Sequence, residues 1–182
     1  VGQNVVIPGK SLNELNKILD DSTDLVNVAL TSQQVLFKTK EVLFFSRLLE
    51  GNYPDTSRLI PDDYQTNVTI NGKSLLQAID RASLLAREDR NNVVRFETVG
   101  QNTVEISSNS PEIGKVKEEI TVENLEGDEL KISFSAKYMM DALKAIDGQD
   151  VMIQFTGTMK PFILRSIHDD AILQLILPVR TY

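Results

Sequence analysis

The sequence of 182 residues contains no cysteine and no tryptophan, and His168 is its only histidine. These absences exclude disulfide bonds, thiolate metal ligands and cysteine nucleophiles, and they leave little imidazole for zinc binding or general-base catalysis. No run approaches the roughly 18 apolar residues of a membrane-spanning helix, and the opening VGQNVVIPGK lacks the pattern of a signal peptide. We therefore expect a cytoplasmic protein without a cofactor or a bound metal.

Basic residues are in the minority, since 19 Lys and Arg against 26 Asp and Glu give a net charge of -7. This balance argues against a broad basic surface that binds DNA tightly, although it leaves room for a local positive face. With 41% hydrophobic and 25% charged residues, the composition is that of a soluble globular protein of one or two domains.

One segment of the sequence occurs three times at an almost constant interval. Lys10, Lys73 and Lys137 each follow a short strand-like run and precede apolar residues at helical spacing, and they are 63 and 64 residues apart. The tetrapeptide GKSL occurs twice unchanged, and Lys17 and Lys144 follow the first lysine of their copies by seven residues. Seven residues are close to two helical turns, so both lysines of a copy share one face. A period of this length indicates a supersecondary unit of one helix and several strands.

Three strand-like stretches rich in Val, Ile, Phe and Thr follow each expected helix and are separated by turn signals. They cover residues 26–30, 33–39 and 41–49, then 93–99, 102–109 and 115–123, then 151–157, 161–167 and 171–179. Short turns between successive strands favour antiparallel pairing. We therefore predict an α+β fold of three βαβββ units, with the helices on one face of antiparallel sheets.

Each expected helix has an apolar face and an opposite face with cations. The apolar residues are Leu12, Leu15, Ile18 and Leu19, then Leu75, Leu76, Ile79 and Ala82, then Met139, Met140, Leu143 and Ile146. The cations are Lys10 and Lys17, then Lys73 and Arg81, then Lys137 and Lys144. They are either ordinary solvated residues or a recurrent functional feature, and the pattern alone leaves both interpretations open.

Residues for catalysis do not converge at a useful spacing. The GKS triplets at 9–11 and 72–74 resemble a phosphate-binding loop, but Asn4 and Asn67 stand where that loop needs its first glycine. His168 lies in SIHDDA, a pattern that predicts an exposed hairpin turn rather than a metal site. The sequence therefore does not support an enzyme.

Two segments with proline are more apolar than a linker or a chain end requires. GNYPDTSRLIPDD, residues 51–63, contains Arg58 beside Leu and Ile, and LQLILPVRTY, residues 173–182, contains Arg180. One interpretation is a buried linker and a final core strand. The other is an apolar groove with cationic edges that captures an extended peptide.

The run NYPDTSRLIP, the helix openings, TMKPFILR and the ending LPVR resemble the bacterial DNA polymerase III beta subunit, the replicative sliding clamp, over essentially the whole chain. In that family, domains built of paired βαβββ units form a ring of two protomers around duplex DNA, with helices lining the hole. The resemblance implies that residues 1–66 are the second half of the middle domain and residues 67–182 the complete C-terminal domain. It therefore implies a fragment, from which ring closure is not expected.

The resemblance also implies three sets of functional residues, none of them catalytic or metal-binding. The partner-peptide groove would comprise Tyr53, Pro54, Arg58, Leu59, Tyr138, Met159, Lys160, Pro161, Leu175, Leu177, Pro178, Val179 and Arg180. The residues facing DNA would be Lys10, Lys17, Lys73, Arg81, Lys137 and Lys144. The dimer edge would comprise Leu84, Leu85 and Glu112. Thr181 and Tyr182 extend past the usual end of the family, and the position of Tyr182 relative to the groove is open.

The function implied by the resemblance is that of a non-catalytic processivity factor in DNA replication. The ring would retain double-stranded DNA topologically, and the helix cations would contact phosphates weakly without reading bases. The groove would dock the DNA polymerase III alpha subunit, the clamp loader and repair polymerases through short linear motifs, and the full-length protein would be a homodimer. The alternative is a peptide-binding module without a DNA role.

Overall fold

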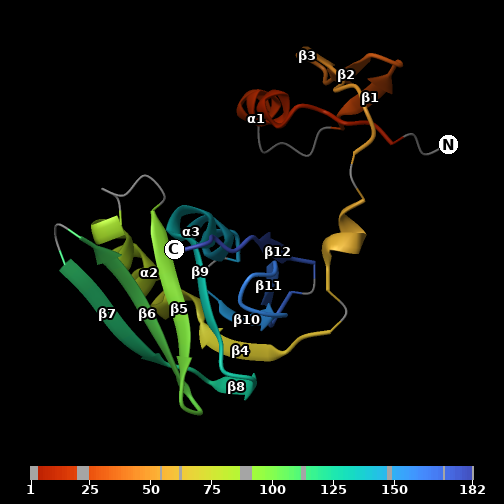
Figure 1. Ribbon diagram of the computed structural model, residues 1–182. Coiled ribbons are helices and arrows are strands. Elements are labelled where there is room, and N and C mark those ends of the chain that lie inside the picture. The colour runs from red at the N-terminus through yellow and green to blue at the C-terminus, as the bar shows by residue number, and fades with distance from the viewer. Residues whose placement is uncertain are drawn as a thin grey trace. The chain divides into compact units, whose positions relative to one another are not determined.

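The computed structural model describes residues 4–19, 25–53, 55–61, 63–86, 92–111, 114–146, 149–169 and 171–181. The chain divides into two compact units, residues 1–55 and 56–182 (Figure 1). Each unit has its own hydrophobic core. Both combine helices with antiparallel sheets, which confirms the predicted α+β class.

The first unit contains one helix and a three-stranded antiparallel sheet among its described residues. They are α1 (Gly9–Ile18), β1 (Asn27–Leu30), β2 (Gln34–Lys38) and β3 (Leu43–Arg47), with β2 in the centre. Its core is small, because Leu15 of α1 packs on Val35 and Phe37 of β2, while Leu12 and Ile18 of the predicted apolar face stay exposed. The described residues of the first unit therefore cover only part of the apolar face of α1.

The second unit contains two antiparallel sheets, with strand orders β12-β11-β10-β4-β8 and β7-β6-β5-β9. Its helices are η1 (Thr56–Leu59, a 3-10 helix), α2 (Gly72–Ala86) and α3 (Ala136–Ala145). Its strands are β4 (Thr66–Asn71), β5 (Val93–Val99), β6 (Thr103–Ser110), β7 (Gly114–Thr121), β8 (Asn124–Gly127), β9 (Lys131–Ser135), β10 (Asp150–Phe155), β11 (Phe162–Ser166) and β12 (Leu173–Ile176). The short strand β8 was not predicted.

The two repeats of the second unit exchange the strand that precedes each helix. Strand β4 pairs along its whole length with β10 of the following repeat, and β9 pairs with β5 of the preceding one. The predicted βαβββ repeat therefore completes its sheet only with a neighbouring repeat. In the first unit, which holds one repeat, the corresponding residues 5–8 form no strand, and the Leu49 N–H donates to the Val6 carbonyl oxygen at 2.8 Å instead.

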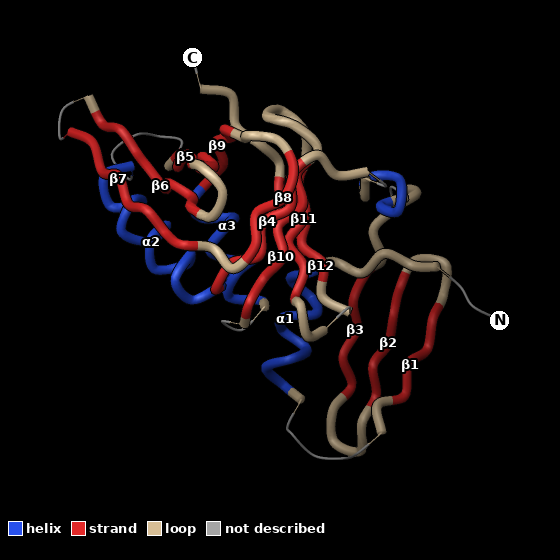
Figure 2. The backbone as a smooth tube through the Cα atoms, turned by 90° about the horizontal axis from the view of Figure 1, so that it is seen from below, coloured by secondary structure: helices blue, strands red, loops and turns tan. Residues whose placement is uncertain are grey.

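Helix α2 begins where β4 ends, because Asn71 caps it. The Asn71 Oδ1 atom accepts hydrogen bonds from the Ser74 N–H at 3.0 Å and the Ser74 hydroxyl at 3.1 Å. The Asn71 amide also donates to Asp150 Oδ1 at 2.9 Å, which ties the cap to β10. The apolar faces predicted for α2 and α3 are confirmed, since Leu75, Ile79, Ala82, Met139, Leu143 and Ile146 are buried. Both helices lie on the same side of the strands (Figure 2).

Four phenylalanine rings connect the two sheets of the second unit. Phe96 of β5 lies with its ring centroid 5.3 Å from that of Phe155 of β10, and Phe134 of β9 lies 5.8 Å from Phe162 of β11. Phe155 and Phe162 are 4.9 Å apart, and all four side chains are fully buried. The rings thus form a single core from strands of both sheets.

Candidate functional site

The C-terminal segment bridges the edges of the two sheets of the second unit. Strand β12 pairs with β11 at one edge, and the chain then continues to β9, the edge strand of the other sheet. There Pro178 forms an isolated antiparallel bridge with Phe134, and the Val179 N–H donates to the Ser133 carbonyl oxygen at 2.8 Å. Leu177, between the two pairings, is 66% exposed. The pairing therefore fixes the backbone on both sides of an exposed leucine.

A hollow of about 420 Å³ opens beside this segment, and we call it the C-terminal hollow. Its lining residues come from β5, β9, the β10–β11 loop and the chain end: Arg95, Lys131, Ile132, Ser133, Thr158, Met159, Val179, Arg180 and Thr181. Met159 and Val179 supply apolar surface, while Arg95, Lys131 and Arg180 supply positive charge. An apolar lining with a few cations suits a ligand that carries apolar side chains together with carboxylate or backbone carbonyl groups.

The structure brings three of the predicted groove residues together in this hollow, namely Met159, Val179 and Arg180. Lys160 is exposed and Pro161 is half-buried next to Met159 in the same loop, and Pro178 holds the chain end against β9. The remaining predicted groove residues do not line the hollow.

The other predicted groove residues lie on β12, α3 and η1 and in the segment that precedes η1. Leu175 is half-buried in β12, opposite Ile163, and Tyr138 at the start of α3 is 66% exposed. Arg58 and Leu59 lie exposed on η1 in the second unit. Tyr53 is exposed in the first unit, and Pro54 lies outside the described residues.

Arg95, Lys131, Ile132, Ser133 and Thr158 line the hollow but were not predicted from the sequence. The alternation in VVRFETV, residues 93–99, places Arg95 on the face of the strand opposite Phe96. The outward orientation of Arg95 was therefore predictable from the sequence. The pairing of β5 with β9 was not predictable, because it joins strands of two different repeats. Without that pairing, nothing in the sequence brings Arg95 to the chain end.

All six predicted DNA-facing cations are exposed on their helices, but they differ in their partners. Lys17 pairs with Glu14 at 2.9 Å, whereas Lys10, Lys73, Lys137 and Lys144 have no ion-pair partner among the described residues. The four unpaired ammonium groups are therefore the ones available to an anionic ligand.

Arg81 of α2 forms a bidentate ion pair with Glu118 of β7. Its Nε donates to Glu118 Oε2 at 2.9 Å, and its terminal Nη2 donates to Oε1 of the same carboxylate. This hydrogen bonding lowers the pKa of Glu118 and raises the pKa of Arg81. Glu118 of the edge strand β7 therefore faces α2.

The predicted dimer edge lies at the end of α2. Leu84 is 55% exposed and Leu85 is half-buried, while Glu112 lies outside the described residues. Strand β7 is the adjacent edge of the four-stranded sheet, so its outer hydrogen-bonding groups have no strand partner within the described part of the chain.

Neither a metal cluster nor a membrane-spanning helix occurs in the described part of the chain. Its Asp, Glu and His residues form no group of three that could hold a metal ion. No described helix combines the length and the apolarity needed to cross a membrane. His168 is exposed in the β11–β12 turn, where its N–H donates to Ser166 Oγ at 3.2 Å, and the predicted turn is confirmed.

Both units match domain families of one protein. The C-terminal domain of the DNA polymerase III beta subunit matches residues 57–180, and its central domain matches residues 2–55. The chain belongs to the DNA polymerase III beta subunit family. The resemblance noted in the sequence is thereby confirmed.

Relatives in this family are similar over almost the whole chain. The beta sliding clamp of Bacillus subtilis is 63% identical over 179 residues, and that of Staphylococcus aureus strain N315 is 57% identical over 180 residues. The crystal structure of the Bacillus subtilis clamp matches 99% of this chain with a TM-score of 0.92 and 62% identity. The beta chain from Streptococcus pneumoniae TIGR4 matches 97% with a TM-score of 0.90 and 42% identity.

The chain spans about half the length of these relatives, since the matches cover 47% of the Bacillus subtilis protein and 48% of the Staphylococcus aureus protein. The two matched structures are likewise covered over 47% of their chains. The part in common consists of central-domain and C-terminal-domain sequence.

Proposed function

We propose that this chain is part of a DNA sliding clamp, a non-catalytic subunit that gives DNA polymerase III its processivity in the bacterial cytoplasm. The observation that carries the proposal is the C-terminal hollow, in which Met159, Val179 and Arg180 combine apolar surface with positive charge. Its occupant would be a short extended peptide that inserts apolar side chains. Similarity to beta sliding clamps along nearly the whole chain supports this assignment.

The partners proposed for the hollow are the polymerase alpha subunit, the clamp loader and repair polymerases, each through a short linear motif. A motif of few residues buries little area, so affinities in the micromolar range are expected. Tyr53, Pro54, Arg58, Leu59, Tyr138, Lys160, Pro161, Leu175, Leu177 and Pro178 remain proposed members of the groove. We propose that residues 1–66 are the second half of the middle domain and that residues 67–182 are the complete C-terminal domain.

The proposed DNA contacts are the helix cations. Lys10, Lys73, Lys137 and Lys144 would meet phosphates, because none of them is neutralised by a described partner. Arg81 and Lys17 would contribute less, because their side chains already form ion pairs with Glu118 and Glu14. In a closed ring these contacts can stay weak, since topology keeps the duplex inside. The full-length protein would be a homodimer with Leu84, Leu85 and Glu112 at its edge.

Replacement of Pro178 and Arg180 by alanine together is expected to abolish docking of a polymerase tail peptide. The Pro178 ring restricts the backbone where the chain end bridges to Phe134, and Arg180 supplies charge to the hollow. Fluorescence polarisation with a labelled peptide measures the effect, and circular dichroism checks the fold. The control is Leu84→Ala, which removes an exposed apolar side chain outside the hollow. Unchanged affinity of the double variant would remove the groove assignment.

Substitution of Lys10, Lys73 and Lys137 by glutamine is expected to shorten the products of a primer-extension processivity assay. The test uses a chimaera in which this chain replaces the corresponding half of the Bacillus subtilis clamp. Loss of three phosphate contacts weakens the hold on DNA and makes it more salt-sensitive. The matched control replaces three exposed cations of the β2–β3 region, Lys38, Lys40 and Arg47, and is expected to leave product length unchanged.

The alternative function is a peptide-binding module without a DNA role. It is favoured if the helix triple variant retains full processivity at every salt concentration while the Pro178 and Arg180 variant still loses peptide docking. The DNA contacts of the helices and the peptide contacts of the hollow are thus tested separately.

A further inference from the structure

The outward face of the four-stranded sheet carries a regular arrangement of charged and short polar side chains. In one row across the strands, Glu119, Glu105, Glu97 and Lys131 lie opposite one another. In the next row, Lys117 of β7 lies opposite Ser107 of β6, which lies opposite Arg95 of β5, followed by Ser133 of β9. Short serines between long cations leave room on this face.

This arrangement produces a second hollow of about 460 Å³, which we call the outer hollow. Ser107 and Ser133 line it together with Arg95, Lys115, Lys117 and Lys131. Arg95, Lys131, Ser133 and Thr181 line the C-terminal hollow as well, so the two hollows adjoin at these residues of β5, β9 and the chain end. A chain seated in the first hollow can therefore continue into the second.

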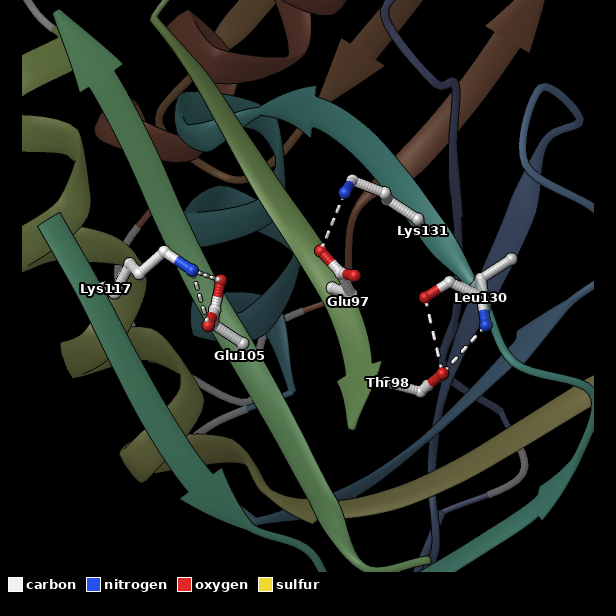
Figure 3. Close-up of polar contacts among 6 residues, drawn as sticks. All are labelled: Glu97, Thr98, Glu105, Lys117, Leu130 and Lys131. Atoms are coloured by element: carbon white, nitrogen blue, oxygen red, sulfur yellow. Dashed lines mark hydrogen bonds and ion pairs between the residues drawn. The ribbon is translucent and has the colours of Figure 1, made fainter. Parts of the chain in front are cut away.

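Two carboxylates of this face, those of Glu105 and Glu97, are already paired with lysines, as Figure 3 shows. Lys117 Nζ binds both oxygens of Glu105 at 3.0 Å, and Lys131 Nζ lies 3.1 Å from Glu97 Oε2. Among the described residues, Arg95, Lys115 and Arg180 have no ion-pair partner. The two hollows together thus contain five cations and two paired carboxylates, in a chain whose net charge is -7.

We propose that the outer hollow is an exosite for an acidic segment that flanks the docking motif of a partner peptide. This inference rests on the proposed function of the C-terminal hollow and adds the chemistry of the flanking residues. The unpaired Arg95 and Lys115 would bind carboxylates of the segment, and the serine hydroxyls would donate to its carbonyl groups. The partner would gain affinity and a fixed direction along the groove.

An acidic peptide fits this face better than duplex DNA does. The row of Glu119, Glu105 and Glu97 lies directly beside the cations, and a rigid polyanion laid over the sheet would meet these carboxylates too. A flexible peptide can place one or two carboxylates at Arg95 and Lys115 and leave the glutamate row uncovered. The volume of the hollow, about 460 Å³, is also within the usual range of small-ligand sites.

The test compares four labelled peptides by fluorescence polarisation: the polymerase tail peptide alone, with three glutamates at its N-terminal end, with three at its C-terminal end, and with three glutamines. One of the two acidic peptides, the one extended at the end that points to the outer hollow, is expected to bind about 5-fold more tightly than the unextended peptide at low salt. The gain is modest because it comes from two or three exposed charge contacts. The gain is expected to vanish at about 0.5 M salt.

Two variants locate the contact. Lys115→Glu, which lies outside the C-terminal hollow, is expected to cancel the acidic gain and leave the affinity of the unextended peptide unchanged. For Arg95→Gln, only the ratio between the affinity of the acidic peptide and that of the unextended peptide is compared with the wild type. The absolute affinities are not compared, because Arg95 lines both hollows. Lys73→Glu, the same charge reversal on α2, is expected to preserve the gain.

The outcomes separate this inference from the function on which it rests. If the unextended peptide fails to bind, both fall together. If it binds but neither acidic extension improves on the glutamine extension, or the gain survives in Lys115→Glu, the exosite alone is overturned. A duplex oligonucleotide whose binding depends on Lys115, with no acidic gain for the peptides, also overturns it in favour of a DNA contact.

Discussion

Replacement of Phe155 by alanine is expected to lower the free energy of unfolding of the second unit by about 3–5 kcal/mol. The ring is fully buried and lies between Phe96 and Phe162, at centroid distances of 5.3 and 4.9 Å. Its removal leaves a cavity at the junction of the two sheets, which neither backbone can fill without breaking strand pairs. Urea unfolding followed by far-ultraviolet circular dichroism measures the loss.

The control for this prediction is Phe45→Ala on β3. Phe45 has the same side chain but is 59% exposed, so its loss is expected to change stability by less than about 1 kcal/mol. A loss below about 1 kcal/mol for Phe155→Ala as well would show that the rings are not a joint between the sheets.

Replacement of Gly72 by alanine is expected to destabilise the protein by at least about 2 kcal/mol, the cost of overpacking at a rigid site. A Cβ atom at this position would lie 2.3 Å from the Gln149 carbonyl oxygen, which is backbone and cannot rotate away. The Gly72 N–H also donates to that oxygen at 3.2 Å, so separation of the two segments loses a hydrogen bond. Thermal unfolding followed by circular dichroism measures the effect.

The matched control is Gly9→Ala in the other copy of GKSL. A Cβ atom at Gly9 meets nothing within 4 Å, and Gly9 is the first residue of α1. Alanine there is expected to be neutral or stabilising by about 0.5 kcal/mol, because it restricts the unfolded chain and favours the helix. Equal effects of the two substitutions would contradict the role assigned to the contact with Gln149.

The local features of the fold were predictable from the sequence because they depend on residues close in the chain. The burial of Leu75 and Ile79 follows from helical spacing, and the turn at His168 follows from its polar neighbours. Most strands were located within a few residues. The exchange of β4 and β9 was not predictable, because either sheet satisfies the same alternation of apolar residues.

In the candidate site, too, the features that depend on the pairing of distant strands were the ones that the sequence did not predict. Met159, Val179 and Arg180 were assigned through family resemblance, and they line one hollow in the structure. Arg95 was missed, because its approach to the chain end depends on the pairing of β5 with β9. The pairing of Arg81 with Glu118 was missed for a related reason, since the orientation of Glu118 depends on the register of the edge strand. The boundary expected at residue 66 and the dimer edge remain predictions.

The exchanged strands have a consequence for how the second unit opens. Since β4 belongs to one repeat but lies within the sheet of the other, and β9 does the reverse, neither repeat can detach without breaking both sheets. We expect the backbone amides of β5 and β10 to exchange with deuterium at the same limiting rate, through one global opening event, as in a single foldon. The described residues of the first unit show no such interlock, and this unit is expected to exchange independently and sooner.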